Sequence, residues 1–227
     1  MTVLSHTKRV ILALLATNMA FALPSHPASN TTCTGYPISQ GPEDAYTVAP
    51  ACPPDSSTLM LSALPECARL ATNAAAAARS GTAPQLRTIF KTTDPAVHAH
   101  IASTFDAIAS ACGTTSTTSI PTIHCGDAPP RTECTTGKVA GYATGHTVAF
   151  CPFFFGLPLL PSSCEKSKSR AGLVVHEFAH VRDLVGGWIV DVAYFPEGVL
   201  GLGTADALRN ADSFHLFAVG VEMGCWV

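Results

Sequence analysis

Apolar residues cluster most densely between Leu173 and Val185, where no proline interrupts the run. Their spacing covers most sides of a helix, which indicates a helix buried in a core rather than one lying on the surface. Gly186 and Gly187 follow directly and offer the left-handed residue at which helices often end. The pattern therefore predicts a helix over residues 173–185.

Three other segments show helical signals. Cys67–Arg79 contains an alanine-rich run of high helix propensity, and Ser80-Gly81 follows it. Asp94 and Pro95 suit the cap and first position of a helix that Gly113 ends. Along that helix apolar residues recur at helical spacing, at Val97, Ile101, Phe105, Ile108 and Cys112. Thr204–Gly224 is predicted to be the last helix, with Leu208, Phe214, Phe217 and Val221 on one side.

The β signals are fewer. Ala140–Ala143 and Thr147–Phe150 are short β-like runs, and Gly145-His146 between them indicates a hairpin with a solvated turn. A small sheet combined with several helices predicts an α/β (α+β) fold. The chain of 227 residues suits one domain with a sizeable core.

The first 22 residues have the pattern of a secretory signal peptide. Lys8 and Arg9 precede an apolar run, Val10–Ala22, which ends in the small-x-small sequence Ala20-Phe21-Ala22. The run is too short to cross a bilayer. We therefore expect cleavage after residue 22 and a secreted, extracellular protein with no membrane segment in its mature form. Residues 23–57 are rich in Pro, Ser, Thr and Gly, so we expect a flexible extension or short pro-segment there, and a folded domain over residues 58–227.

Net charge and cysteine content reduce the number of function classes that fit the sequence. The net charge is −3, or −5 without Lys8 and Arg9, and the sequence has no basic stripe. This excludes the usual electrostatic basis of nucleic-acid binding. Nine cysteines in an exported chain predict disulfides. Because nine is odd, at least one cysteine stays free or pairs with another molecule.

The most informative motif lies within the predicted helix over residues 173–185. It reads His176-Glu177-Phe178-Ala179-His180, which matches the H-E-x-x-H pattern of zinc proteases. Positions i and i+4 of a helix share one face, so His176 and His180 can bind one Zn²⁺ while Glu177 reaches its water as general base. Two histidines and a glutamate in so apolar a helix need compensation, which a metal provides.

A catalytic zinc needs three protein ligands and one open position. The candidates after His180 are Asp183, Asp191, Glu197, Asp206, Asp212 and His215. Spacing alone does not choose among them, although Asp183 is too close on the same helix to reach round the metal easily. No third histidine at metzincin spacing and no glutamate-bearing helix of the thermolysin type is evident.

From Cys67 to Cys225 the sequence resembles the deuterolysin family, the fungal aspzincin zinc metalloendopeptidases. The resemblance is carried by the HEFAH helix and by the stretches CARLATNAAAAARSG, FKTTD, HCGD and ADALRNADSFHLFA. It implies a single zincin-type domain with a small sheet, a zinc-binding helix, packing helices and stabilising disulfides. It also implies Zn²⁺ as cofactor and a protein or peptide as substrate. We expect a monomer that binds neither nucleic acid nor, in mature form, a membrane.

The resemblance further implies site residues. The family takes its third ligand from an aspartate in a G-T-x-D-x-x-Y-G stretch, which here reads WIVDVAYF over residues 188–195. Asp191 matches that ligand, and Tyr194 matches the tyrosine that supports the transition state. The Gly-Thr pair and the final Gly are replaced, so the loop geometry is altered. Asp212 matches a family aspartate on the last helix, for which we expect a role behind the ligands, with direct ligation as the alternative. His215 is a candidate for the same supporting layer.

By position, the family's disulfides would join Cys67 to Cys125, Cys134 to Cys151 and Cys164 to Cys225. We further expect a Cys33–Cys52 pair and a free, buried Cys112.

The implied function is a secreted zinc metalloendopeptidase in which His176, His180 and Asp191 hold zinc while Glu177 and Tyr194 act catalytically. Phe153–Phe155 could line its substrate cleft or pack in the core. The alternative function is a non-proteolytic secreted effector or interaction protein on the same zinc-binding fold. The short segment before the domain and the altered stretch around Asp191 favour that alternative, whereas the intact Glu177 argues against it.

Overall fold

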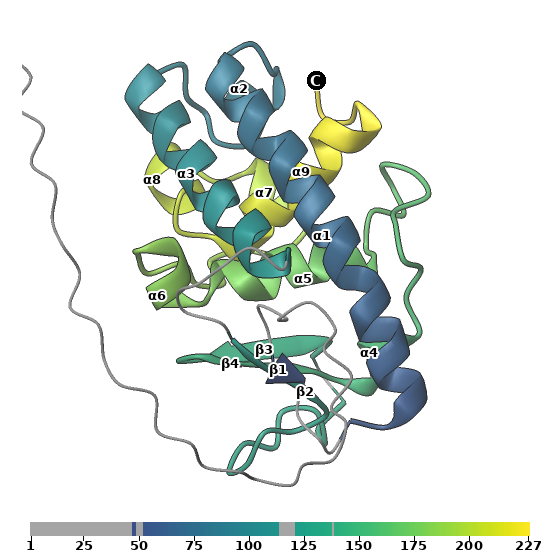
Figure 1. Ribbon diagram of the computed structural model, residues 1–227. Helices are drawn as coiled ribbons and strands as arrows, with labels where there is room; N and C mark the ends of the chain where they lie inside the picture. Colours follow the sequence, from purple (N-terminus) through teal and green to yellow (C-terminus); the bar gives the residue numbers. More distant parts are fainter. Residues whose placement is uncertain (1–46, 49–51, 114–120, 138) are drawn as a thin grey trace, which may run out of the picture. The chain divides into compact units, whose positions relative to one another are not determined.

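The computed structural model of the protein describes residues 47–48, 52–113, 121–137 and 139–227. Within these ranges the chain forms one four-stranded sheet covered by helices, with the sheet at the lower side in Figure 1. The strands are β1 (Thr47–Val48), β2 (Thr122–Cys125), β3 (Gly141–Thr144) and β4 (Thr147–Phe150), in the order β1-β2-β4-β3. This arrangement confirms the expected α+β class.

The sheet is mixed. β1 and β4 both run parallel to β2, whereas β3 pairs antiparallel with β4 through the hairpin predicted from Gly145-His146. The observed hairpin strands begin within one residue of the predicted ones. β2 was not predicted, because its four residues include a histidine and show no clear alternation. β3 lies at one edge of the sheet, and this edge faces the helix that carries the HEFAH motif.

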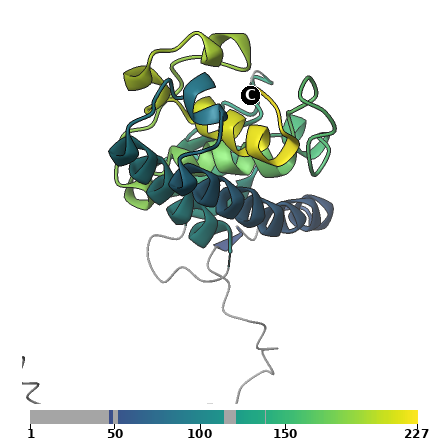
Figure 2. The same cartoon turned by 90° about the horizontal axis from the view of Figure 1, so that it is seen from above.

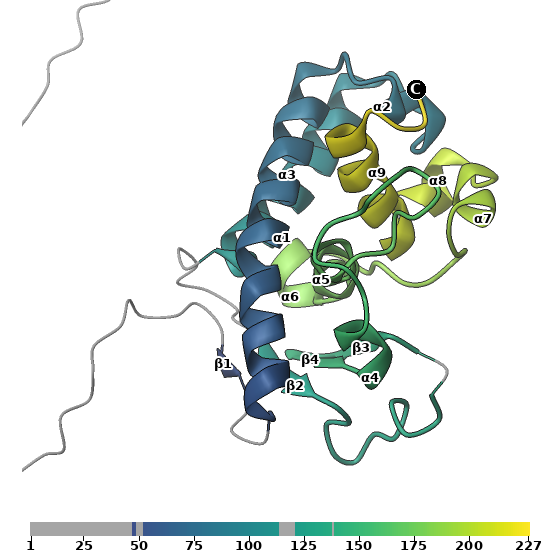
Figure 3. The ribbon, with the colours of Figure 1, turned by 90° about the vertical axis from the view of Figure 1, so that its right-hand side faces the viewer.

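Two long helices form the main support of the domain. α1 (Pro54–Ser80) is longer than the predicted segment, with Pro54 at its first turn and Gly81 in the left-handed conformation at its end. α3 (Pro95–Cys112) begins as predicted, with the Asp94 side chain accepting a hydrogen bond from the Ala96 N–H. The two helices pack side by side (Figure 3).

The motif helix α5 (Arg170–Ala179) occupies the centre of the molecule, between the sheet and α9 (Ala211–Met223). The Ser169 hydroxyl caps its start by accepting from the Gly172 N–H. The prediction of a continuous helix to Val185 is wrong. The backbone becomes extended at Val181 and resumes as the short α6 (Arg182–Val185), which ends at the left-handed Gly186.

The last predicted helix is also divided. α8 (Thr204–Ala207) and α9 are separated at Leu208–Asn210, and Asn210 there forms an isolated parallel bridge with Val190. Figure 2 shows α9 alongside α1, with which it shares contacts. The core beside α9 includes four aromatic rings, in which Phe90 and Phe105 each contact both Phe214 and Phe217.

Three further short helices complete the described part: α2 (Gln85–Thr88), α4 (Pro152–Phe155) and α7 (Glu197–Leu200). No helix in the described ranges has both the length and the apolar character required to cross a membrane.

Four disulfides connect the described elements, and two of the expected pairings are wrong. Cys134–Cys151 and Cys164–Cys225 are present as expected. Cys67 pairs with Cys112 instead of Cys125, because the packing of α1 against α3 places the two side chains together. Cys112 is therefore not free.

Cys125 pairs with Cys52, since β1 lies beside β2 and brings the start of α1 to the end of that strand. The expected Cys33–Cys52 pair is thereby excluded. Cys33 itself and the expected signal peptide lie outside the described residues. Of the segment expected to be an extension, residues 47–48 lie in the sheet and residues 54–57 begin α1.

Candidate metal centre and active-site cleft

Three side chains from two segments converge beside the edge strand. His176 lies on α5 and His180 directly follows its last residue, one turn further on, while Asp191 lies on the segment that returns after α6. Their facing atoms form a nearly equilateral triangle. His176 Nε2 is 3.2 Å from His180 Nε2 and 3.3 Å from Asp191 Oδ1, and His180 Nε2 is 3.4 Å from the same oxygen. The structure thus brings together the three residues that the sequence and the family resemblance nominated.

These distances fit a tetrahedral zinc ion. Ligand atoms held at about 2.0–2.1 Å from a tetrahedral Zn²⁺ are separated from one another by about 3.4 Å. Two imidazole nitrogens and one carboxylate oxygen are also a donor set that zinc favours. Among the described residues this group supplies three donors, the number that a catalytic zinc site takes from the protein while it keeps a fourth position for water or substrate.

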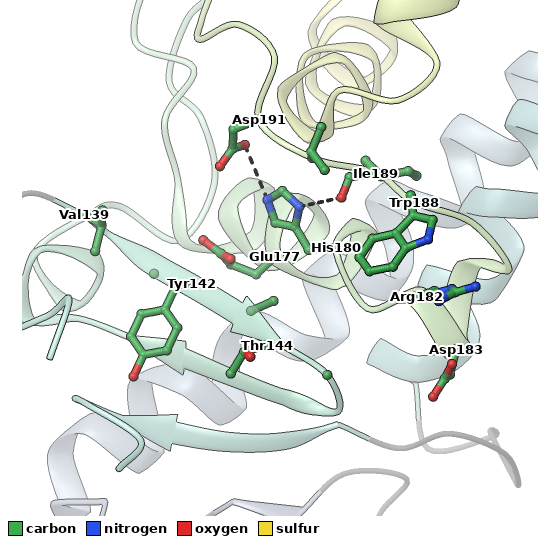
Figure 4. A pocket seen from close by; sticks show the side chains of 14 residues that line it. Val139, Tyr142, Thr144, Glu177, His180, Arg182, Asp183, Trp188, Ile189 and Asp191 are labelled. Carbon is green, nitrogen blue, oxygen red and sulfur yellow. Dashed lines mark hydrogen bonds and ion pairs between the residues drawn. The ribbon is translucent and has the colours of Figure 1, made fainter. Parts of the chain in front are cut away.

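A hydrogen bond to His180 and an ion pair to His176 restrain the two imidazole rings from behind the triangle. His180 Nδ1 donates to the Ile189 carbonyl oxygen at 2.9 Å, as Figure 4 shows. His176 Nδ1 lies 2.7 Å from Asp212 Oδ1, in a pair that is largely buried. With each Nδ1 engaged in this way, each Nε2 lone pair is directed at the metal position.

The carboxylates around His176 create a strongly negative environment. Burial opposes the imidazolium form, but Asp191 and Asp212 outweigh it and raise the pKa of His176 to about 10. Burial likewise opposes ionisation of these two carboxyls, yet the neighbouring histidines hold both of their pKa values well below the usual range. An environment that favours a positive charge in this way also favours a divalent cation.

Glu177 is buried against the backbone of the edge strand. Burial raises its carboxyl pKa, and its Oε2 has no hydrogen-bond partner among the described residues. The lack of a side chain at Gly141 creates the space for it, because a Cβ there would lie 2.8 Å from Glu177 Oε1. Sequence reasoning missed Gly141, since a glycine at the start of a short β-like run can equally mark a bulge or a bend.

The loop that carries Asp191 is held by a residue that sequence reasoning also missed. Asn210 is fully buried, and its Oδ1 accepts hydrogen bonds from the backbone N–H groups of Val192 and Ala193. Asp212 adds a third bond by accepting from the Phe195 N–H. The residues between α8 and α9 therefore stabilise the loop, which accounts for the break in the predicted last helix.

Two hollows meet at Glu177 and Asp191. The larger, of about 660 Å³, extends past His180 between β3 and residues 188–191 (Figure 4). The smaller, of about 390 Å³, lies on the His176 side, and its lining includes Tyr194, which is 66% exposed. Phe153 is exposed and contributes to the lining of this smaller hollow, whereas Phe154 is buried in the core.

The remaining candidates occupy other positions. Asp212 and His215 are buried behind His176, and Asp183 is exposed on α6, where it pairs with His146 at the hairpin turn. Glu197 begins α7 and Asp206 lies in α8, where it pairs with Arg209. A second grouping, His176, Asp212 and His215, shares His176 with the first and is completely buried.

Comparisons with known proteins agree with this geometry. The aspzincin family model, described as lysine-specific metallo-endopeptidase, matches residues 75–219. A neutral protease 2 homolog of Phaeosphaeria nodorum is 33% identical over 212 residues, which cover 92% of this chain and 53% of that protein. Neutral protease 2 of Aspergillus oryzae is 32% identical over 176 residues, which cover 77% of this chain and 49% of the relative.

The fold has a counterpart among solved structures. A zinc peptidase from Grifola frondosa aligns with a TM-score of 0.60 at 20% identity, covering 74% of this chain and 97% of that one. At this identity the likeness concerns the fold alone. The chain spans about half the length of the curated relatives that it matches.

Proposed function

The chain belongs to the aspzincin family of metalloendopeptidases, and from this premise we propose that it is a zinc-dependent endopeptidase. The observation that carries the proposal is the triangle of His176, His180 and Asp191 beside the buried Glu177, at the floor of a cleft along an edge strand. The three donors would hold Zn²⁺, which supplies a Lewis acid and lowers the pKa of a water molecule.

Glu177 is the general base in this proposal. It accepts a proton from the water that attacks the peptide carbonyl carbon and then donates that proton to the leaving amine. Its unpartnered Oε2 is available for this transfer, and the surrounding protein shields the carboxyl from bulk water.

Tyr194 would stabilise the oxyanion in this proposal. Partial burial and the neighbouring Asp191 raise the pKa of its phenol, which therefore stays protonated and able to donate at neutral pH. The side chain lies at the edge of the smaller hollow that also contains Glu177 and Asp191. Donation to the developing negative charge would lower the barrier of the attack step. Asp212 is a positioning residue that orients His176.

The substrate is an extended peptide. In the described sheet, β3 pairs only with β4, so its outer edge can form backbone hydrogen bonds with a peptide laid along the cleft. The same contacts would be available to many sequences. This supports cleavage within protein chains rather than recognition of one small molecule.

The proposed place of action is outside the cell. Four disulfides stabilise the described part of the chain, which is typical of proteins that fold in an oxidising compartment. N-terminal sequencing of protein recovered from culture medium should start at Leu23 or later. Retention of the protein inside the producing cell with an intact Met1 would refute this localisation.

Metal dependence tests the function directly. A chelator should abolish hydrolysis of casein, and one equivalent of Zn²⁺ should restore it. Asp191→Asn should weaken zinc binding and hydrolysis together, because the triangle loses its anionic donor. Asp206→Asn removes an equally charged but distant carboxylate and serves as the control. Hydrolysis that persists in the metal-free protein would overturn the proposal.

A further inference from the structure

An exposed indole lies in the larger hollow of the cleft. Trp188 is 71% exposed and contributes to the same lining as Glu177, His180 and Asp191. A tryptophan side chain carries a large apolar surface that folded proteins usually cover. The family's pattern has Gly at this position, so the indole is a feature of this chain. A ligand bound next to the metal centre would cover this exposed apolar surface.

The ring is held in place from one side. The Arg182 guanidinium, from α6, lies 4.6 Å from the centre of the Trp188 ring and covers one of its faces. The next residue, Ile189, accepts the hydrogen bond from His180 Nδ1, which fixes this part of the backbone relative to the metal centre. Contacts that restrict the ring before binding reduce the conformational entropy lost when a ligand stacks on it.

The opposite wall of the hollow is the edge strand. Residues 141–144 of β3 contribute to the lining of the same hollow as Trp188 and Glu177. A peptide laid along β3 would be extended, with alternate side chains pointing to opposite sides. Some of these side chains would face residues 188–191. They would belong to substrate residues a few positions away from the scissile bond.

We propose that Trp188, supported by Arg182, is a specificity-determining residue that stacks on an aromatic side chain of the substrate. The inference rests on the proposed function, because it assigns a preference to the same cleft. A flat aromatic ring matches the open face of the indole better than an aliphatic side chain does. Offset-stacked aromatic pairs gain interaction free energy in addition to that of the buried apolar area. The preference applies to a substrate residue that lies a few positions away from the scissile bond.

Fluorescence can report this contact without hydrolysis. Trp188 and Trp226 are the two tryptophans of the chain, so a Trp226→Phe, Glu177→Gln protein reports Trp188 alone. The zinc-loaded protein would be titrated with a set of Ala/Ser/Gly decapeptides that carry a single Phe at successive positions. At one or two positions Phe should alter the Trp188 emission and tighten binding by about 3- to 10-fold over the peptide without Phe. Equal affinity and unchanged emission at every position would overturn the proposal.

Kinetics provide the second readout. Trp188→Ala should lower kcat/KM for the preferred Phe peptide by about 3- to 10-fold, mainly through KM, and should leave the peptide without Phe unchanged. Trp188→Phe should restore most of the preference. Val192→Ala is the matched control, because Val192 is an exposed apolar residue of the same loop that does not line the hollow.

The two proposals fail differently. If the wild type hydrolyses all peptides with no aromatic preference, the role of Trp188 is refuted and the peptidase function stands. If the wild type hydrolyses none of them or casein, the peptidase function is refuted, and the fluorescence titration still decides whether Trp188 binds an aromatic side chain.

Discussion

His176 contacts two carboxylates, and the two have different surroundings. Asp191 faces the cleft and is about one-third exposed at its side chain, whereas Asp212 is buried behind the ring and also accepts from the Phe195 N–H. The geometry therefore favours Asp191 as the ligand and Asp212 as the residue that orients His176. Spacing could not separate these roles, because both aspartates follow His180 at distances that a loop can span.

The role of Tyr194 can be tested by removing its phenolic oxygen alone. Tyr194→Phe removes the phenolic donor and keeps the ring, so kcat should fall by about 10- to 100-fold while KM and zinc content stay close to the wild type. Steady-state kinetics with metal analysis would check this. An unchanged kcat would show that Tyr194 does not stabilise the transition state.

At the scale of elements, the motif helix and the edge strand define the site together. The hydrophobic pattern predicted the position of α5, the start of α3 and the β3–β4 hairpin, because these depend on local spacing, capping and turn residues. It did not predict the end of α5 at Ala179. That break depends on the return of residues 188–192, where Ile189 accepts a hydrogen bond from His180 and Val192 donates one to Asn210, and these are tertiary contacts.

β3 and α5 approach each other closely at Gly141 and Glu177, so the addition of one methyl group at Gly141 has a predictable effect. In Gly141→Ala the new Cβ would lie 2.8 Å from Glu177 Oε1 and 3.0 Å from the Ala149 carbonyl oxygen. Glu177 must shift, so kcat should fall at least about 10-fold while zinc stays bound. Gly203→Ala, where a Cβ meets no atom within 4 Å, is the control for kinetics and metal content. Wild-type activity in Gly141→Ala would contradict the placement of the base.

Across the whole molecule, disulfides connect the sheet and the helices that position the site. Two pairings were predicted by position in the family, and two required the spatial arrangement of β1, β2, α1 and α3. Cysteine spacing carries no information on which helices pack together, so Cys52–Cys125 and Cys67–Cys112 could not be obtained from the sequence.

This disulfide pairing predicts which peptides are recovered linked and how the free energy of unfolding changes when one bridge is removed. Peptide mapping without reduction should recover the Cys52–Cys125 and Cys67–Cys112 linked peptides. The double substitution Cys52→Ala, Cys125→Ala should lower the free energy of unfolding by about 2–4 kcal/mol, because the bridge restrains a long loop of the unfolded chain. Recovery of a Cys67–Cys125 peptide would contradict the observed packing of α1.

In the proposed active site, three side chains bind zinc and Glu177 performs the proton transfer. The most direct test is zinc content and casein hydrolysis, measured on the wild-type protein and on Glu177→Gln. We expect one zinc per chain in both proteins, and hydrolysis in the wild type with at most about a thousandth of that rate in the variant. Substantial hydrolysis by Glu177→Gln, or a folded wild-type protein that binds no zinc, would contradict it.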